Sequence, residues 1–214
     1  RGDELRGENS FADAIDYYHA ALAKSESAVL HNKIGMAQLK MLHLDKAQKE
    51  FERALKRDPF YAEAYNNLGV ASYMQNDYKK AIRRYQKALG LRESSASFHS
   101  NLGTAYFARK QYDKASSEYL RALELDSEVF ERQSSTGVSA HMVSRGDRAR
   151  FSYVIARIYA KNGNAERCLL YLRKAMEAGY AGISDVYKDE EFAQVRKDPR
   201  FNELMASKPV AVTN

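Results

Sequence analysis

The 214-residue chain has no tryptophan and few residues that break or cross-link a fold: one cysteine, three prolines and eleven glycines. A single cysteine, Cys168, excludes an internal disulfide and leaves the redox compartment open. Because proline and glycine interrupt helices, their scarcity permits long helical segments. No apolar run approaches the roughly 18 residues of a membrane span, and the first residues do not follow a secretory-signal pattern. We therefore expect an all-α protein without a membrane span.

The charge balance is only mildly basic. Lysine and arginine number 34 against 28 acidic residues, which gives a formal net charge of +6. Hydrophobic residues make up 44% of the chain, as is usual for a folded protein. This balance permits an anionic partner, but it is weaker than the charge of a dedicated nucleic-acid binder, so nucleic-acid binding is not favoured.

Four sets of residues recur with one spacing of 34 positions. Apolar residues between them follow helical periodicity over two segments, joined by a short turn such as Asn76-Asp77. Small residues where two helices cross let the backbones approach, and a large ring fills the volume beyond. The sequence therefore predicts repeated antiparallel helix pairs. The sets are Gly35, Gly69 and Gly103; Ala47, Ala81 and Ala115; Phe51, Tyr85 and Tyr119; and Ala54, Ala88 and Ala122.

These positions resemble the tetratricopeptide repeat, with its Leu-Gly pair, its two alanines, its aromatic positions and a proline after the second helix. The match is strong over residues 28–129 and looser over 1–27 and 149–182. It implies a right-handed α-α superhelix of about five helix pairs over residues 1–182, in which the first repeat is truncated. His31 and His99 depart from the family at a position that is usually a large aromatic, and Ser72 replaces a usual tyrosine.

Two segments interrupt or end the period. Residues 130–148 form a polar insertion, longer than the usual connection in a compact array, and loops of this size are often functional or mobile. Residues 183–207 resemble the closing segment that follows many bacterial arrays of this family, and 189–205 are expected to form two short helices. Asp198 and Pro199 would begin the second of these. Such a segment would cover the exposed face of the last repeat.

The resemblance also implies a binding surface, because the first helix of each pair lines a concave groove in this family. Exposed asparagine amides there could both donate to and accept from the backbone of an extended peptide. Asparagine is also common at this position without such a role, and Tyr73 and Phe107 could equally be packing residues. The candidate peptide-binding residues are Asn32, Lys33, Asn66, Asn67, Val70, Tyr73, Ser100, Asn101, Phe107 and Arg157.

Catalytic patterns are not evident. The five histidines have no metal-ligand spacing, and His31 and His99 are expected to be packed imidazoles. Cys168 replaces an alanine at a helix crossing, so we expect a buried thiol rather than a nucleophile. Phosphate-binding glycine loops are absent. We therefore expect a non-catalytic protein that needs no cofactor and no metal.

The sequence favours a protein-protein interaction scaffold that binds a peptide or protein segment in the groove. One alternative is a regulatory or assembly module of a larger protein, and another is an adaptor for an anionic partner, either nucleic acid or a membrane surface. The second rests on a basic stripe without acidic residues, formed by Lys79, Lys80, Arg83, Arg84 and Lys87. An uncapped N-terminal end would also allow homo-oligomers. The compartment is open: cytoplasmic, or periplasmic if a signal or anchor preceded Arg1.

Overall fold

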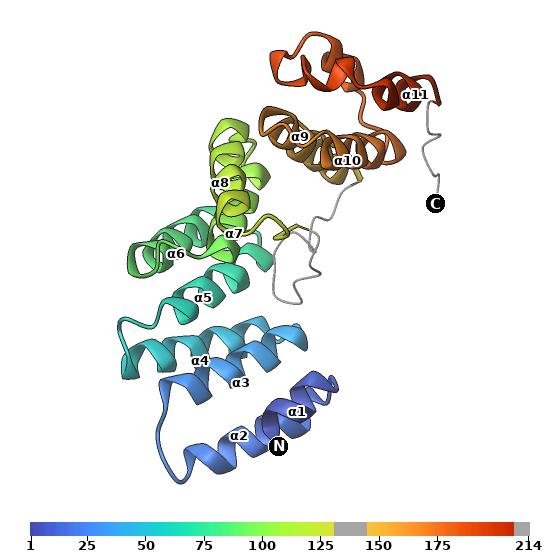
Figure 1. Cartoon of the computed structure of the whole chain (residues 1–214). Coiled ribbons are helices and arrows are strands. Elements are labelled where there is room, and N and C mark those ends of the chain that lie inside the picture. Colours follow the sequence, from blue (N-terminus) through green and yellow to red (C-terminus); the bar gives the residue numbers. More distant parts are fainter. Residues whose placement is uncertain (131–144, 208–214) are drawn as a thin grey trace. The chain divides into compact units, whose positions relative to one another are not determined.

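A computed structural model of the chain describes residues 1–130 and 145–207 (Figure 1). It divides into two compact units, Arg1–Ser139 and Ala140–Asn214, each of which is considered by itself. All regular elements among the described residues are helices, so the predicted all-α class is confirmed. Whether one array continues from the first unit into the second stays a prediction.

The first unit is a row of helix pairs. Pairs α3–α4, α5–α6 and α7–α8 have the most extensive internal packing, and each pair also contacts the next through α4–α5 and α6–α7. In Figure 1 these helix pairs follow one another as stacked hairpins, coloured from blue through green to yellow. The helices are α1 (Gly2–Gly7), α2 (Phe11–Leu22), α3 (Ala28–Lys40), α4 (Leu44–Arg57), α5 (Ala62–Met74), α6 (Tyr78–Leu91), α7 (Ala96–Ala108) and α8 (Tyr112–Leu125).

The 34-residue sets have the predicted packing role. A side-chain Cβ built on Gly103 would lie 2.7 Å from the Tyr119 ring, and one on Gly69 would overlap the Tyr85 ring still more closely. Both rings are completely buried. Glycine is therefore required at this crossing because the aromatic ring of the second helix occupies the space of a Cβ.

The turn between the two helices of a pair uses a left-handed residue at the same repeat position each time. Backbone φ is 60° at Leu42, 62° at Asn76 and 59° at Lys110. Asparagine and glycine tolerate this conformation, whereas a leucine side chain is disfavoured in it. The side chain of Asp77 then caps α6 by accepting a hydrogen bond from Lys80 N at 3.0 Å.

The second unit contains one long helix pair followed by short helices. Helix α9 (Arg145–Lys161) packs against α10 (Ala165–Glu177), and Cys168 is fully buried between them, as expected. The last four residues of the predicted insertion 130–148 belong to α9. Residues 131–144 of that insertion lie outside the described residues.

The C-terminal segment differs in part from the prediction. Where two short helices were predicted over residues 189–205, the structure has two 3-10 helices (Glu190–Phe192 and Val195–Lys197) followed by α11 (Pro199–Ser207). A further 3-10 helix, Ile183–Tyr187, precedes them. Asp198 accepts from Arg200 N at 3.0 Å, so the predicted start at Asp198-Pro199 is confirmed. The 190–192 turn packs on α9, and α11 packs on α10. Tight 3-10 turns bring Phe192 and Val195 inward within very few residues.

Candidate functional site

A ladder of asparagine side chains crosses the first helices of three successive pairs. Asn67 Nδ2 on α5 donates to Asn32 Oδ1 on α3 at 2.9 Å, and Asn101 Nδ2 on α7 donates to Asn66 Oδ1 on α5 at 2.9 Å. Within α5, Asn66 Nδ2 donates to Asn67 Oδ1 at 3.2 Å. Both bonds between helices join residues 35 positions apart, so the repeat itself sets their geometry. We refer to these four residues as the asparagine ladder.

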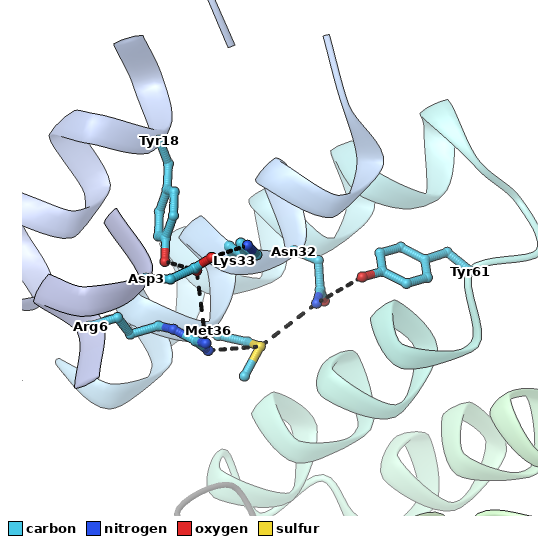
Figure 2. A network of polar contacts seen from close by, with 7 residues as sticks. All are labelled: Asp3, Arg6, Tyr18, Asn32, Lys33, Met36 and Tyr61. Carbon is cyan, nitrogen blue, oxygen red and sulfur yellow. Dashed lines mark hydrogen bonds and ion pairs between the residues drawn. The ribbon is translucent and has the colours of Figure 1, made fainter. Parts of the chain in front are cut away.

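Beyond the ladder, weaker contacts continue towards the N-terminus (Figure 2). Asn32 Nδ2 faces the Tyr61 hydroxyl oxygen at 3.4 Å and the Met36 sulfur at 3.7 Å. The Arg6 guanidinium approaches the same sulfur at 3.9 Å from α1. A thioether is a weak acceptor, so Met36 joins α1 to the ladder mainly by contact rather than by strong hydrogen bonding.

A second group of polar contacts in Figure 2 joins α1, α2 and α3, and an ion pair between Arg6 and Asp3 at 4.0 Å connects it to the Met36 contacts. Asp3 accepts from the Tyr18 hydroxyl at 2.7 Å and from Lys33 Nζ at 2.5 Å. The hydrogen bond from Lys33, followed by that from Tyr18, lowers the pKa of the Asp3 carboxyl. Burial, followed by the hydrogen bond to Asp3, raises the pKa of Tyr18 to about 12. Lys33 is therefore already occupied by a carboxylate of the same chain.

The expectation that the candidate residues are exposed is wrong for most of them. Asn32, Asn66, Asn67, Ser100 and Asn101 are between 3% and 7% exposed, and Val70 is 2% exposed. Their neighbours on adjacent first helices explain this, because amide-to-amide hydrogen bonds hold the helices close enough for the side chains to cover one another. Periodicity places these side chains on the face that the first helices share, but it does not give the distance between helices.

The two aromatic candidates pack within their own helix pairs. The ring centroids of Tyr73 and Tyr78 are 5.1 Å apart, and those of Phe107 and Tyr112 are 5.2 Å apart. Tyr73 and Phe107 are both buried. Arg157 belongs to the second unit, where it forms an ion pair with Glu191 at 3.3 Å. The structure therefore brings the asparagines, Val70, Ser100 and the two rings into one unit and leaves Arg157 in the other.

Sequence reasoning missed a pair of buried histidine–glutamate contacts. His31 Nδ1 lies 2.8 Å from Glu50 Oε2, and His99 Nδ1 lies 2.6 Å from Glu118 Oε2. Both histidines are buried, as expected, in place of the usual aromatic. The signal was present in the sequence, since each glutamate follows its histidine by 19 residues. A buried imidazole nitrogen needs a hydrogen-bond partner, and the carboxylate on the second helix provides it. An aromatic hydrocarbon ring at the same position would need no such partner.

One residue of the predicted basic stripe on α6, Arg84, is not a free surface cation. Arg84 donates to the Leu68 carbonyl at 3.0 Å and to Ser72 Oγ at 2.5 Å, and burial lowers its pKa. Ser72 is thus the small partner that makes room for this guanidinium. Arg84 is a structural residue, while Lys79 and Arg83 are exposed.

The residues that the structure describes offer neither a side-chain cluster for a metal ion nor a membrane span. No group of three or more His, Cys, Asp or Glu side chains in residues 1–130 and 145–207 could hold a metal ion. None of the helices there is long and apolar enough to cross a membrane. Burial raises the pKa of the Cys168 thiol to about 12.

Stacked two-helix units with a shared face of first helices define the chain as a helical-repeat protein. Sequence profiles described as "Tetratricopeptide repeat" match residues 32–88, 96–129 and 149–178, and one described as "TPR repeat" matches residues 71–108. The chain belongs to the tetratricopeptide repeat family. A search of curated proteins found no match.

Solved structures with the same fold have low sequence identity to this chain. MamA is 24% identical, with a TM-score of 0.56 over 83% of this chain and 93% of its own. YrrB, described as a TPR protein with an unusual peptide-binding site, is 20% identical, with a TM-score of 0.53 over 87% and 88%. PilF of Pseudomonas aeruginosa is 17% identical, with a TM-score of 0.63 over 96% and 94%. The tetratricopeptide fold supports a role as a protein-interaction scaffold.

Proposed function

We propose that the face formed by α3, α5 and α7 binds an extended segment of a partner protein, and that the chain catalyses no reaction. The observation that carries this proposal is the asparagine ladder, which places polar amides in a line across three successive repeats. Tetratricopeptide repeat proteins are generally non-catalytic scaffolds.

The ladder leaves hydrogen-bonding capacity for a peptide backbone. A carboxamide has two N–H donors and two acceptor lone pairs. Asn67 donates once to Asn32 and accepts once from Asn66, which leaves it one N–H and one lone pair. The ladder bonds also fix the orientation of the amide before a ligand arrives. A pre-oriented amide loses less conformational entropy when it binds a peptide carbonyl or N–H.

An apolar residue beside the ladder favours an apolar side chain in the ligand. Met36 is half-buried and lies one helical turn from Asn32, whereas Val70, at the equivalent distance from Asn66, is 2% exposed. An extended peptide that bonds to the amides would direct a side chain towards Met36. The ligand class is therefore an extended segment with an apolar residue opposite Met36.

Peptides selected by display against the chain provide the test. Their affinity is measured for the native chain, for Asn66→Ala combined with Asn67→Ala, and for the control Lys79→Ala on exposed α6. We expect the double variant to bind about tenfold more weakly and the control to bind normally, since each lost hydrogen bond contributes about 0.5–1.5 kcal/mol. Circular dichroism checks that the double variant is folded. Equal affinity for all three proteins would contradict the proposal.

Peptide-induced chemical-shift changes give a second measurement that needs no variant. We expect the largest amide shifts in α3, α5 and α7. Shifts confined to α4, α6 and α8 would place the ligand on the other helices and reject this face as the site.

A further inference from the structure

A cavity of about 700 Å³ lies among α2, α3 and α4, and none of the ladder residues lines it. Its walls come from the C-terminal end of α2, the first turn of α3 and the last turns of α4. His31 lies at this cavity, where Glu50 and Glu26 hold its two ring nitrogens at 2.8 and 3.0 Å. The volume is within the range of about 300–1,000 Å³ that is usual for small-molecule sites.

Positive charge dominates the lining. Arg53, Lys56 and Arg57 line the cavity from α4, and Glu26 is the one carboxylate among the lining residues. That carboxylate already contacts the His31 ring. Leu22 and Ala23 add an apolar wall from α2.

Two of the three cations have no counter-ion in the part of the chain that the structure describes. Arg53 donates to Glu50 at 2.5 Å, so its charge is paired. No hydrogen bond or ion pair joins the side chains of Lys56 and Arg57 to another residue of the described ranges 1–130 and 145–207. Both are exposed and are therefore available to a ligand.

The helix dipole does not by itself account for the two basic residues, Lys56 and Arg57, at the end of α4. Basic residues in the last turn of a helix stabilise its carbonyl end. The second helices of the next two pairs, α6 and α8, have no basic residue in their last turns, whereas α4 has Lys56 and Arg57. The repeat therefore forms without such a pair, and in α4 the pair coincides with a cavity.

We propose that this cavity binds a small ligand with a phosphate or carboxylate group, and that Lys56 and Arg57 are its charge partners. Arginine offers two parallel N–H donors to an oxyanion, and lysine adds a mobile point charge. Leu22 and Ala23 face the carbon portion of the ligand. This site is independent of the peptide-binding face.

The histidines provide a local measurement of binding. Inorganic phosphate, and separately succinate, is added at constant pH and ionic strength while the imidazole proton resonances are followed by NMR. We expect saturable shifts of His31 and of His19, which also lines the cavity. His99 is the internal control, because it makes the equivalent contact with Glu118 outside the cavity.

A matched pair of variants tests the assigned cations. Lys56→Gln combined with Arg57→Gln removes the two unpaired charges, and Lys46→Gln combined with Lys49→Gln removes two exposed charges of the same helix outside the cavity. We expect the first variant to weaken binding at least about tenfold and the second to leave it unchanged, because charge-assisted hydrogen bonds are strong and local.

The two probes separate the sources of the oxyanion. Saturation by phosphate alone identifies a phosphate-bearing ligand, saturation by succinate alone identifies a carboxylate, and saturation by both supports a general oxyanion site. Three results would overturn the proposal: no saturation by either probe up to about 50 mM, equal weakening by both variants, or a shift of His99 as large as that of His31.

Discussion

The Tyr119 hydroxyl donates a hydrogen bond to Thr104 Oγ1 at 3.2 Å in the core of the α7–α8 pair. The α5–α6 pair has Tyr85 and Val70 at these two positions, and the buried Tyr85 hydroxyl has no hydrogen-bond partner. The same ring therefore fills the same space in both pairs, but its polar atom is satisfied in only one of them. In the α3–α4 pair the ring is Phe51, which has no hydroxyl to satisfy.

This difference predicts opposite effects of one substitution. Tyr119→Phe should lower the free energy of unfolding by about 1 kcal/mol, because it removes a hydrogen bond and leaves Thr104 without that donor. Tyr85→Phe should leave stability unchanged or raise it by about 1 kcal/mol, since it removes an unsatisfied buried hydroxyl. Urea unfolding followed by circular dichroism measures both. Equal destabilisation by the two substitutions would contradict the assignment.

Close packing at the helix crossing predicts that Gly69→Ala destabilises the protein by about 1–3 kcal/mol, because the Tyr85 ring occupies the position of the new methyl group. Gly90→Ala is the matched control. Gly90 lies in α6 with nothing near its Cβ position, so alanine there should stabilise the helix by about 0.5–1 kcal/mol. The sign of each change in Tm tests the packing directly.

The left-handed turn at Leu42 predicts a stabilising substitution. Leu42→Gly should raise stability by about 1 kcal/mol, because glycine adopts a φ of 60° without the steric cost of a leucine side chain. Leu42 is 66% exposed, so little buried apolar surface is lost. Leu170→Gly, at an exposed leucine within α10, is the control and should destabilise. A drop in Tm for Leu42→Gly would show that the leucine makes a contact worth more than the backbone strain.

Burial of Cys168 predicts low thiol reactivity. Its pKa is raised from 9.0 to about 12, so the neutral thiol is favoured in the folded state. The raised pKa contributes to the free energy of unfolding. This contribution is fully present below the ordinary pKa of the thiol and is lost as the pH rises towards about 12. We expect slow labelling by a disulfide reagent at pH 8 and fast labelling in denaturant. Equal rates under the two conditions would mean that α9 and α10 leave the thiol accessible.

The repeat architecture was predictable because each unit uses the same residues for the same contacts. Gly69 and Tyr85 are 16 positions apart in the sequence, and their contact recurs at Gly35 with Phe51 and at Gly103 with Tyr119. Periodicity alone therefore identifies both helices and the crossing between them. The left-handed turn residue Asn76 also recurs with the repeat, at Leu42 and Lys110.

The polar contacts were less predictable. The sequence placed Asn66 and Asn67 on the correct helix, but exposure depends on how closely α3 and α7 approach α5, and composition does not give that distance. The sequence predicts Arg84 to be one of several surface cations, whereas its guanidinium donates hydrogen bonds to the Leu68 carbonyl and to Ser72 Oγ. In the same way, the His31 contact required Glu50 to be recognised as a residue of the core, against the usual exposure of glutamate.

The asparagine ladder has one further consequence, for the growth of the array by gene duplication. Each bond between helices runs from one position of a repeat to a second position of the repeat before it, across 35 residues. A tandem copy of residues 62–95 would present Asn66 and Asn67 again in the same register. Such a copy would add one amide-to-amide bond between helices and one within its own first helix, and each existing bond would keep an equivalent, so the array can lengthen without redesign of its polar interior.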